Sequence, residues 1–113
     1  MEIVKKPWGS YQVIYENKKC KVKIITIDPM QAPSYQSHKF RSETYFILEG
    51  KAQVTIDDVD YEYSKGDIVF VNYNQKHRSR CISSESLVFV EIQQGTYFGE
   101  DDITRYSDDY GRE

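Results

Sequence analysis

Short runs of β-branched or alternating residues, separated by turn residues, recur along this chain and constrain its fold more than any other feature. Eight runs are predicted to be strands, at residues 11–15, 20–27, 45–48, 51–56, 61–63, 68–71, 78–82 and 87–93. No window carries helical apolar periodicity, and valine, isoleucine and tyrosine favour strands. The pattern therefore predicts an all-β sandwich or barrel, because closing the sheet removes exposed edges.

Turn residues predict how these strands connect. Gly50 directly joins two predicted strands and is expected to be a hairpin turn residue. The acidic stretch 57–60 is expected to be a solvated hairpin tip, since it lacks the glycine and the acid spacing of a calcium loop. Within 20–27, alternation separates apolar from basic side chains, with Cys20, Val22 and Ile24 on one face and Lys21 and Lys23 on the other.

Length and charge narrow the class of function. The chain has 113 residues, so one domain spanning 1–113 is expected. A net charge of −3 and a pI of about 5.4 give no electrostatic case for nucleic acid. No apolar run approaches the ~20 residues of a membrane span, and the start of the chain lacks a signal-peptide pattern. Cys20 and Cys81 have no CxxC spacing, which predicts reduced thiols in a cytoplasmic protein.

Four side chains carry the candidate chemistry. His38, Arg41 and Glu43 lie just before the run 45–48, and His77 follows a polar loop much later. Strand parity puts Arg41 and Glu43 on one face, while His38 would point the other way unless a bend re-aims it. Two imidazoles and a carboxylate suit zinc, iron, manganese or nickel. On spacing alone, unrelated histidines and an Arg41–Glu43 ion pair are the better explanation, because H-x4-E is not a specific signal.

Two spaced motifs add weight to a shared site. E-x6-G at 43–50 and G-x10-H at 66–77 together form the two-motif layout of the cupin family. The chain resembles the cupin domain of type II mannose-6-phosphate isomerases, which lies at the C-terminus of bifunctional mannose-6-phosphate isomerase/GDP-mannose pyrophosphorylases. KPWGSY at 6–11 matches the opening of that domain, and 36–45 resembles its Q-x-H-x-H-R-x-E-H-W. Residues 95–112 resemble its GxYLGEDDIxRxxDxYGR almost residue for residue.

The resemblance implies a fold and an activity. The expected fold is a single-domain cupin, a double-stranded β-helix or jelly-roll barrel, with residues 94–113 packing on the barrel. On composition alone that last stretch would be a solvated tail. The expected activity is the interconversion of mannose 6-phosphate and fructose 6-phosphate, for polysaccharide precursor synthesis. Small cupins often form homodimers, and the tyrosine-rich N-terminal strands are the expected surface.

The resemblance also implies a weakened metal site. His38, Glu43 and His77 match metal ligands of the cupin pattern, and Phe40 stands where the family has a second histidine. Phenylalanine cannot coordinate a metal, so a divalent ion (Zn, Mn, Fe or Ni) is expected to bind weakly or not at all. Gln36 or a water molecule is a candidate to fill the gap.

Isomerisation requires a base, an electrophile and a cation for the phosphate. The candidate bases are Glu43 and His77, and the candidate electrophiles are the metal and Arg41. Lys39 or Arg41 would bind the phosphate, with Gln36 as a further substrate-binding residue.

Two other functions stay open at this point. One is a sugar- or sugar-phosphate-binding cupin without catalysis, which the loss of histidine at Phe40 favours. The other is a nucleotide-sugar epimerase or ketoisomerase that uses His38 and a tyrosine, against which the KPWGSY and GEDDI segments argue.

Overall fold

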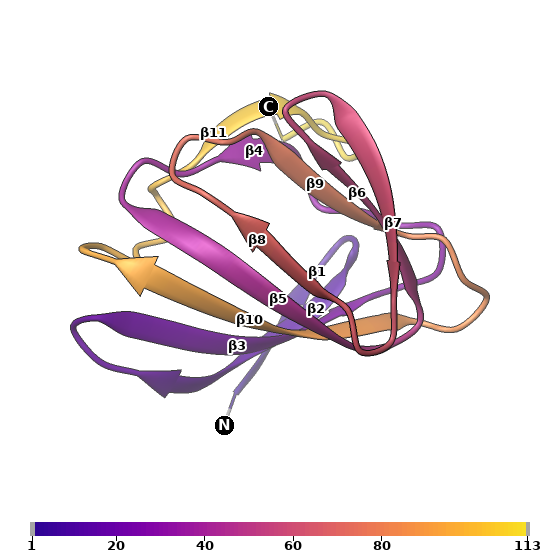
Figure 1. Cartoon of the computed structure of the whole chain (residues 1–113), viewed down its shortest axis with the longest axis horizontal. Helices are drawn as coiled ribbons and strands as arrows, with labels where there is room; N and C mark the ends of the chain where they lie inside the picture. The colour runs from indigo at the N-terminus through magenta and orange to yellow at the C-terminus, as the bar shows by residue number, and fades with distance from the viewer. Residues whose placement is uncertain (1, 113) are drawn as a thin grey trace.

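Two antiparallel sheets face each other and enclose the core in the computed structural model, which describes residues 2–112 (Figure 1). The first sheet has the strand order β1-β2-β3-β10-β5-β8 and the second β11-β4-β9-β6-β7. The strands are β1 (Ile3–Lys6), β2 (Gly9–Glu16), β3 (Cys20–Ile27), β4 (Tyr35–Ser37), β5 (Arg41–Glu49), β6 (Lys51–Ile56), β7 (Val59–Ser64), β8 (Ile68–Val71), β9 (His77–Cys81), β10 (Leu87–Gly95) and β11 (Thr104–Ser107).

The all-β prediction is confirmed, because residues 2–112 form strands and turns without a helix. Within that range there is accordingly no helix with the length and apolarity to cross a membrane. Alternation works as expected in β5 and β10, where every second side chain is buried. The core lies between the two sheets and includes Ile27, Ile47, Val54, Val69 and Leu87, each at most 2% exposed.

The predicted hairpin at Gly50 is wrong. Strand β5 pairs with β10 and β8, whereas β6 pairs with β7 and β9, so Gly50 is the corner where the chain leaves one sheet for the other. A turn residue between two alternating runs looks the same in sequence for a hairpin and for such a corner. The other turn prediction is confirmed: Ile56 pairs with Val59, and Asp57 and Asp58 form the tip with φ angles of 47° and 68°.

The corner at Gly50 gives a stability prediction. Gly50 has φ +82°, and an added Cβ would lie 2.7 Å from the Ser86 carbonyl oxygen and 2.9 Å from the Leu87 Cα. Gly66 has φ +91° but opens onto free space. Both Gly→Ala variants incur left-handed strain, and Gly50→Ala adds a steric clash, so we expect it to cost about 1–3 kcal/mol more. Urea unfolding of both variants measures the difference, and equal costs would contradict it.

The predicted separation of β3 into two faces is confirmed, and the face that carries Lys23 is the inner one. Lys23, Ile25 and Ile27 point into the barrel and are buried, while Val22 and Ile24 face outward. Ile25 and Ile27 are buried in the core, and residues two apart on a strand point to the same face. Lys23 therefore points inward together with them.

The outward residues of the first sheet form two rows across four strands. One row runs Ile24, Val90, Phe46 and Ile68, and the other Val22, Ile92, Thr44 and Phe70. The edge strand β8 is consequently only half-buried, with Ile68 63% and Phe70 54% exposed. We call these two rows the outer apolar face.

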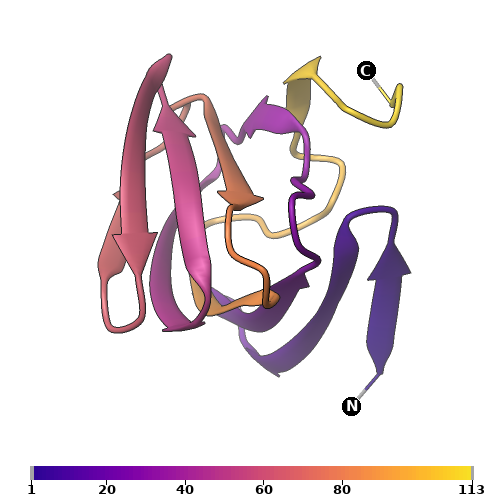
Figure 2. The same cartoon turned by 90° about the vertical axis from the view of Figure 1, so that its right-hand side faces the viewer.

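The two ends of the chain border the open side of the barrel. Strands β1 and β2 form a hairpin that stands at the lower right of Figure 2, below the C-terminal segment. Strand β11 pairs with β4, placing Thr104 opposite Ser37 and Arg105 opposite Gln36. The stretch that composition alone reads as a solvated tail is therefore partly a strand, and Phe98 and Asp102 within it are buried.

Candidate functional site

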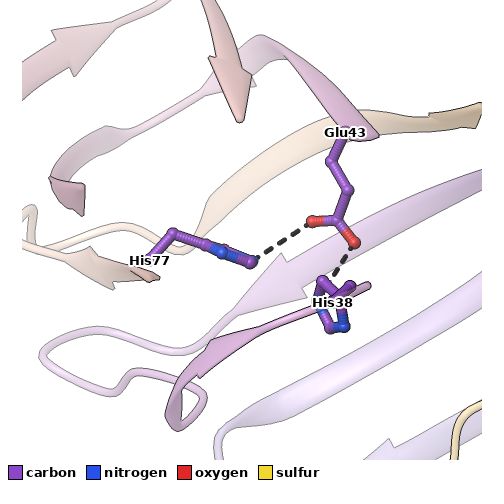
Figure 3. A group of neighbouring side chains, drawn as sticks. All are labelled: His38, Glu43 and His77. Atoms are coloured by element: carbon purple, nitrogen blue, oxygen red, sulfur yellow. Dashed lines mark ion pairs between the residues drawn. The ribbon is translucent and has the colours of Figure 1, made fainter. Parts of the chain in front are cut away.

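Glu43 is the centre of a buried cluster inside the barrel. It points inward from β5 and is 2% exposed. Its Oε1 accepts a hydrogen bond from the Tyr45 hydroxyl at 2.6 Å and lies 3.4 Å from His77 Nε2. Its Oε2 accepts from Arg41 Nε at 2.9 Å and lies 3.4 Å from His38 Nε2. Figure 3 shows the carboxylate between the two histidines, both of which point toward it.

Different local features bring these side chains together. Arg41 and Glu43 share the inward face of β5, as strand parity predicts. His38 precedes a bend at residues 39–40. This bend interrupts the strand alternation, so the imidazole points inward with Arg41 and Glu43 and not to the opposite face. His77 is the first residue of β9 in the opposite sheet, reached after the polar loop 72–76. The predicted meeting of His38 and His77 is found, with ring centroids 5.1 Å apart.

Phe40 lies outside this cluster. Its side chain is 51% exposed and its ring packs edge-to-face on Tyr97 at 6.3 Å. With this backbone, a histidine at position 40 would point to the same outer surface. The position beside His38 and Glu43 is occupied instead by the Arg41 side chain, whose Nη2 lies 3.3 Å from His38 Nε2.

Asp102 holds the bend that re-aims His38. Its carboxylate accepts the backbone N–H groups of Lys39 and Phe40, each at 3.0 Å. Its backbone carbonyl accepts a hydrogen bond from His38 Nδ1 at 2.7 Å. The donor role of Nδ1 leaves the Nε2 lone pair of neutral His38 directed at Arg41.

Removal of the Asp102 carboxylate should therefore loosen the bend. Asp102→Ala leaves two backbone donors unpaired, and we expect a loss of about 1–3 kcal/mol in the free energy of unfolding. The ¹⁵N shifts of His38 should also move toward a mixture of tautomers. Asp101→Ala at the exposed neighbour is the matched control, and an equal effect of the two substitutions would refute this role.

The cluster separates the pKa values of its members. Burial raises the pKa of Glu43, but the hydrogen bond from His77 and the charges of His77, His38 and Arg41 outweigh it and hold that pKa well below its usual range. Burial lowers the pKa of His38. Burial also acts to lower the pKa of His77, but the hydrogen bond and charge of Glu43 prevail and raise it. Glu43 is therefore a firmly held anion.

Three of these residues could hold a metal. One donor atom each from His38, Glu43 and His77 lies within 4.8 Å of the others, a spacing compatible with ligand distances of about 2.0–2.2 Å. However, the Arg41 guanidinium already contacts two of these donors, Glu43 Oε2 and His38 Nε2. The donor set fits a divalent ion only if Arg41 gives up these contacts, so the ion and the guanidinium compete.

A cavity of about 130 Å³ opens beside the cluster, and its walls are rich in positive charge. Six basic and three acidic side chains line it, although the whole chain carries −3: Lys6, Lys23, Arg41, Arg78, Arg105 and Arg112, with Glu43, Glu91 and Glu100. Gln36 also lines the cavity. Lys39 does not, because its side chain is exposed on the outer side of the bend. Such a cavity favours an anionic ligand.

Residues 1–108 match the family model described as "Mannose-6-phosphate isomerase C-terminal". The chain belongs to this family. It is 37% identical over 109 residues to the alginate biosynthesis protein AlgA of Pseudomonas aeruginosa, covering 96% of this chain and 23% of that protein. It is 38% identical over 110 residues to a mannose-1-phosphate guanylyltransferase of Escherichia coli, covering 95% of this chain and 23% of that protein. It thus spans under a quarter of these relatives.

Solved structures confirm the cupin fold of this family member. A Bacillus subtilis oxalate decarboxylase mutant superposes with a TM-score of 0.80 at 20% identity, covering 93% of this chain and 30% of that one. An RmlC-like cupin from Shewanella frigidimarina gives 0.76 at 22% identity, covering 88% and 86%. A putative sugar phosphate isomerase from Acidithiobacillus ferrooxidans gives 0.63 at 26% identity, covering 67% and 50%. The first two likenesses concern the fold alone.

Sequence reasoning missed a second polar group in the cavity of this cupin. Lys23 and Glu91 are buried and line the cavity, and Gln93 is buried beside Glu91. The signal was parity: Glu91 and Gln93 continue the inward positions of Leu87 and Phe89 along β10. Polar residues at core positions of a strand need partners or a ligand, and that requirement was readable from the sequence.

Proposed function

We propose that this cupin domain interconverts mannose 6-phosphate and fructose 6-phosphate. The observation that carries the proposal is one cavity that joins a held carboxylate, an adjacent guanidinium and a basic rim, in a member of the mannose-6-phosphate isomerase C-terminal family. The names of its relatives, such as "Alginate biosynthesis protein AlgA", support a role in polysaccharide precursor synthesis. Free Cys20 and Cys81 support a reducing, cytoplasmic location.

Arg41 is the proposed electrophile. It is 6% exposed, and its Nη1 has no hydrogen-bond partner among the described residues while its side chain lines the cavity. A buried, unpaired donor of this kind stabilises the negative oxygen of an enediolate. Glu43 fixes the guanidinium through Nε and keeps it charged at any physiological pH.

We propose that the phosphate group of the substrate binds at the rim of the cavity. Arg78, Arg105 and Arg112 line it there, on β9, on β11 and near the C-terminus. Guanidinium groups match phosphate oxygens with paired donors. Arg112 already donates to Asp108 and Arg78 to Asp109 and Ser107, so a phosphate bound there would take the place of these partners. They replace Lys39, which lies outside the cavity, while Gln36 remains on the wall as a substrate-binding candidate.

If a divalent ion is present, His38, Glu43 and His77 would hold it. It would supply a Lewis acid that polarises the sugar carbonyl. Because Arg41 competes for two of the three donors, we propose that the ion binds weakly and that Arg41 supplies the positive charge without it.

Conversion of mannose 6-phosphate to fructose 6-phosphate, with added divalent ions and with a chelator, tests the proposal. Turnover in both conditions is the expected result. Turnover that a chelator abolishes would assign the electrophile to the metal instead. Binding of either sugar phosphate without turnover would replace the enzyme by a binding domain, and turnover of a nucleotide sugar alone would also refute the proposal.

The outer apolar face is the proposed homodimer surface. Its two rows span β3, β10, β5 and β8, and they leave Ile68, Phe70 and Phe46 more than 40% exposed. The N-terminal strands named from sequence lie at the far edge of the same sheet. Sedimentation should give twice the 13.3 kDa chain mass at micromolar concentration. Ile68→Glu should give monomers, whereas Val59→Glu in the other sheet should not.

A further inference from the structure

We propose that Glu91 is the general base of this cavity, moving the substrate proton between C1 and C2. The inference rests on the isomerase function proposed above. The sequence led us to expect Glu43 or His77 as the base. Glu43 and His77 are both fully engaged by neighbouring groups, whereas Glu91 is not.

Glu43 has little capacity left to accept a proton. One oxygen faces Tyr45 and His77 and the other faces Arg41 and His38, so four groups surround the carboxylate. Its pKa lies well below the usual range because these partners outweigh burial. A carboxylate stabilised in this way is a weak base at neutral pH.

His77 is engaged at both ring nitrogens. Its Nδ1 lies 3.1 Å from the Gln75 carbonyl oxygen, to which it donates, and its Nε2 faces Glu43 at 3.4 Å. The Glu43 carboxylate favours the protonated ring. His77 is therefore a charge partner of Glu43.

Glu91 has the opposite environment in the same cavity. It is 6% exposed on β10, and within residues 2–112 its hydrogen bonding engages Oε2 alone, from Gln93 Nε2 at 2.7 Å. The other oxygen is left for a ligand. Burial, followed by the charge of Glu43, raises the pKa of Glu91 to about 7, while Lys23 and Arg41 lower it. Two carboxylates with pKa values moved apart in one site correspond to separate roles, one as anion and one as base.

Glu91 alone can remove the proton from C2 and return it at C1. Glu91 takes the proton from C2 of the open-chain aldose, the C–H electron pair forms the C1–C2 double bond, and the carbonyl π electrons move to O1 beside Arg41. O1 gains a proton as O2 loses one. The C2–O2 double bond then forms, and the C1–C2 electron pair takes the proton back from Glu91 at C1. No oxidant or further reactant is required.

Lys23 is a positioning residue in this scheme. It reaches from β3, is 4% exposed, and its Nζ bonds the Glu100 carboxylate at 3.1 Å and lies 4.2 Å from the Tyr11 ring centroid. The charged groups acting on Glu91 include Lys23 from β3, Arg41 and Glu43 from β5, and His77 from β9, whose own pKa the Glu91 charge helps to raise. Gln93 on the same strand is neutral and donates a hydrogen bond. Lys23→Met removes one charge that favours ionised Glu91, so the acidic limb of the kcat/KM profile should move to higher pH.

Glu91→Gln tests the proposal directly. We expect kcat to fall at least about 100-fold with KM within about threefold, and solvent deuterium to stop entering the sugar. Glu91→Asp is the second variant, for the case that Glu91→Gln does not fold. It keeps a carboxylate but moves it one methylene away from the substrate, and it should lose about 10–100-fold in kcat. Glu62→Gln on the exposed face of β7 is the matched control.

The outcomes separate this inference from the proposed function. If the wild type isomerises the sugar phosphate and either Glu91 variant keeps wild-type kcat, Glu91 is not the base while the function stands. If a chelator-independent acidic limb fails to move in Lys23→Met, the assignment of that limb to Glu91 is wrong. If the wild type shows no isomerisation or deuterium exchange, the proposed function and this inference both fail.

Discussion

Replacing Glu43 by alanine is expected to remove about 3–5 kcal/mol from the free energy of unfolding. The substitution leaves the Arg41 guanidinium, 6% exposed, without the carboxylate that binds its Nε, and it also removes the acceptor of the Tyr45 hydroxyl. A buried charge without its partner is costly because it has lost both water and its counter-ion. Urea unfolding measures the loss.

Two further variants distinguish this cause from a simple cavity. Glu49→Ala, at the exposed end of β5, should change the free energy of unfolding by less than about 0.5 kcal/mol. The double variant Arg41→Met with Glu43→Leu removes both charges and should recover most of the stability lost in Glu43→Ala. If the double variant is as unstable as the single one, packing volume and not the unpaired charge explains the loss.

The same cluster predicts a pH dependence. The folded-state pKa of Glu43 is depressed, so its contribution to stability is complete above the unfolded pKa of about 4.3 and is lost as pH falls through the folded value. The folded-state pKa of His77 is raised, so its contribution is present below about 6.5 and is lost as pH rises through the folded value. Glu43→Gln should remove the acid-side loss and weaken the alkaline-side loss.

The strands could be predicted because strand formation is local. Period-two alternation and turn residues lie within a few positions of one another, and they located the runs that became β3, β6, β8 and β10. What alternation cannot show is which strand pairs with which. Gly50 looked like a hairpin for that reason, since its role as a corner depends on β5 pairing with β10, far along the chain.

The sequence predicted which residues form the site but not how their side chains are oriented. His38, Arg41, Glu43 and His77 were expected to meet, and they do. That His38 turns inward depends on Asp102, 64 residues later in the sequence, which no local pattern reveals. The consequence of Phe40 was also hidden, because the bend that Asp102 holds sends this side chain outward.

Arg41→His is expected to raise divalent metal affinity by at least about tenfold, whereas Phe40→His should leave it unchanged. Position 41 shares the inward face of β5 with Glu43, so an imidazole there lies toward His38 and Glu43 as a fourth donor. The substitution also frees Glu43 Oε2 and His38 Nε2 from the competing guanidinium. Position 40 is half-exposed on the opposite side of the bend, so a donor placed there does not face the cluster.

Calorimetric titration with Zn²⁺ or Mn²⁺ compares the two variants with the wild type. Arg41→Met is the necessary third variant, because it removes the charge without adding a donor and should raise affinity less than Arg41→His. If Phe40→His gains affinity and Arg41→His does not, the bend at 39–40 must rearrange on metal binding, and the competition between Arg41 and the ion would be refuted. If only Arg41→His gains, this cupin has exchanged metal affinity for a built-in guanidinium cation, which explains how Arg41 acts in the isomerisation when no metal is bound.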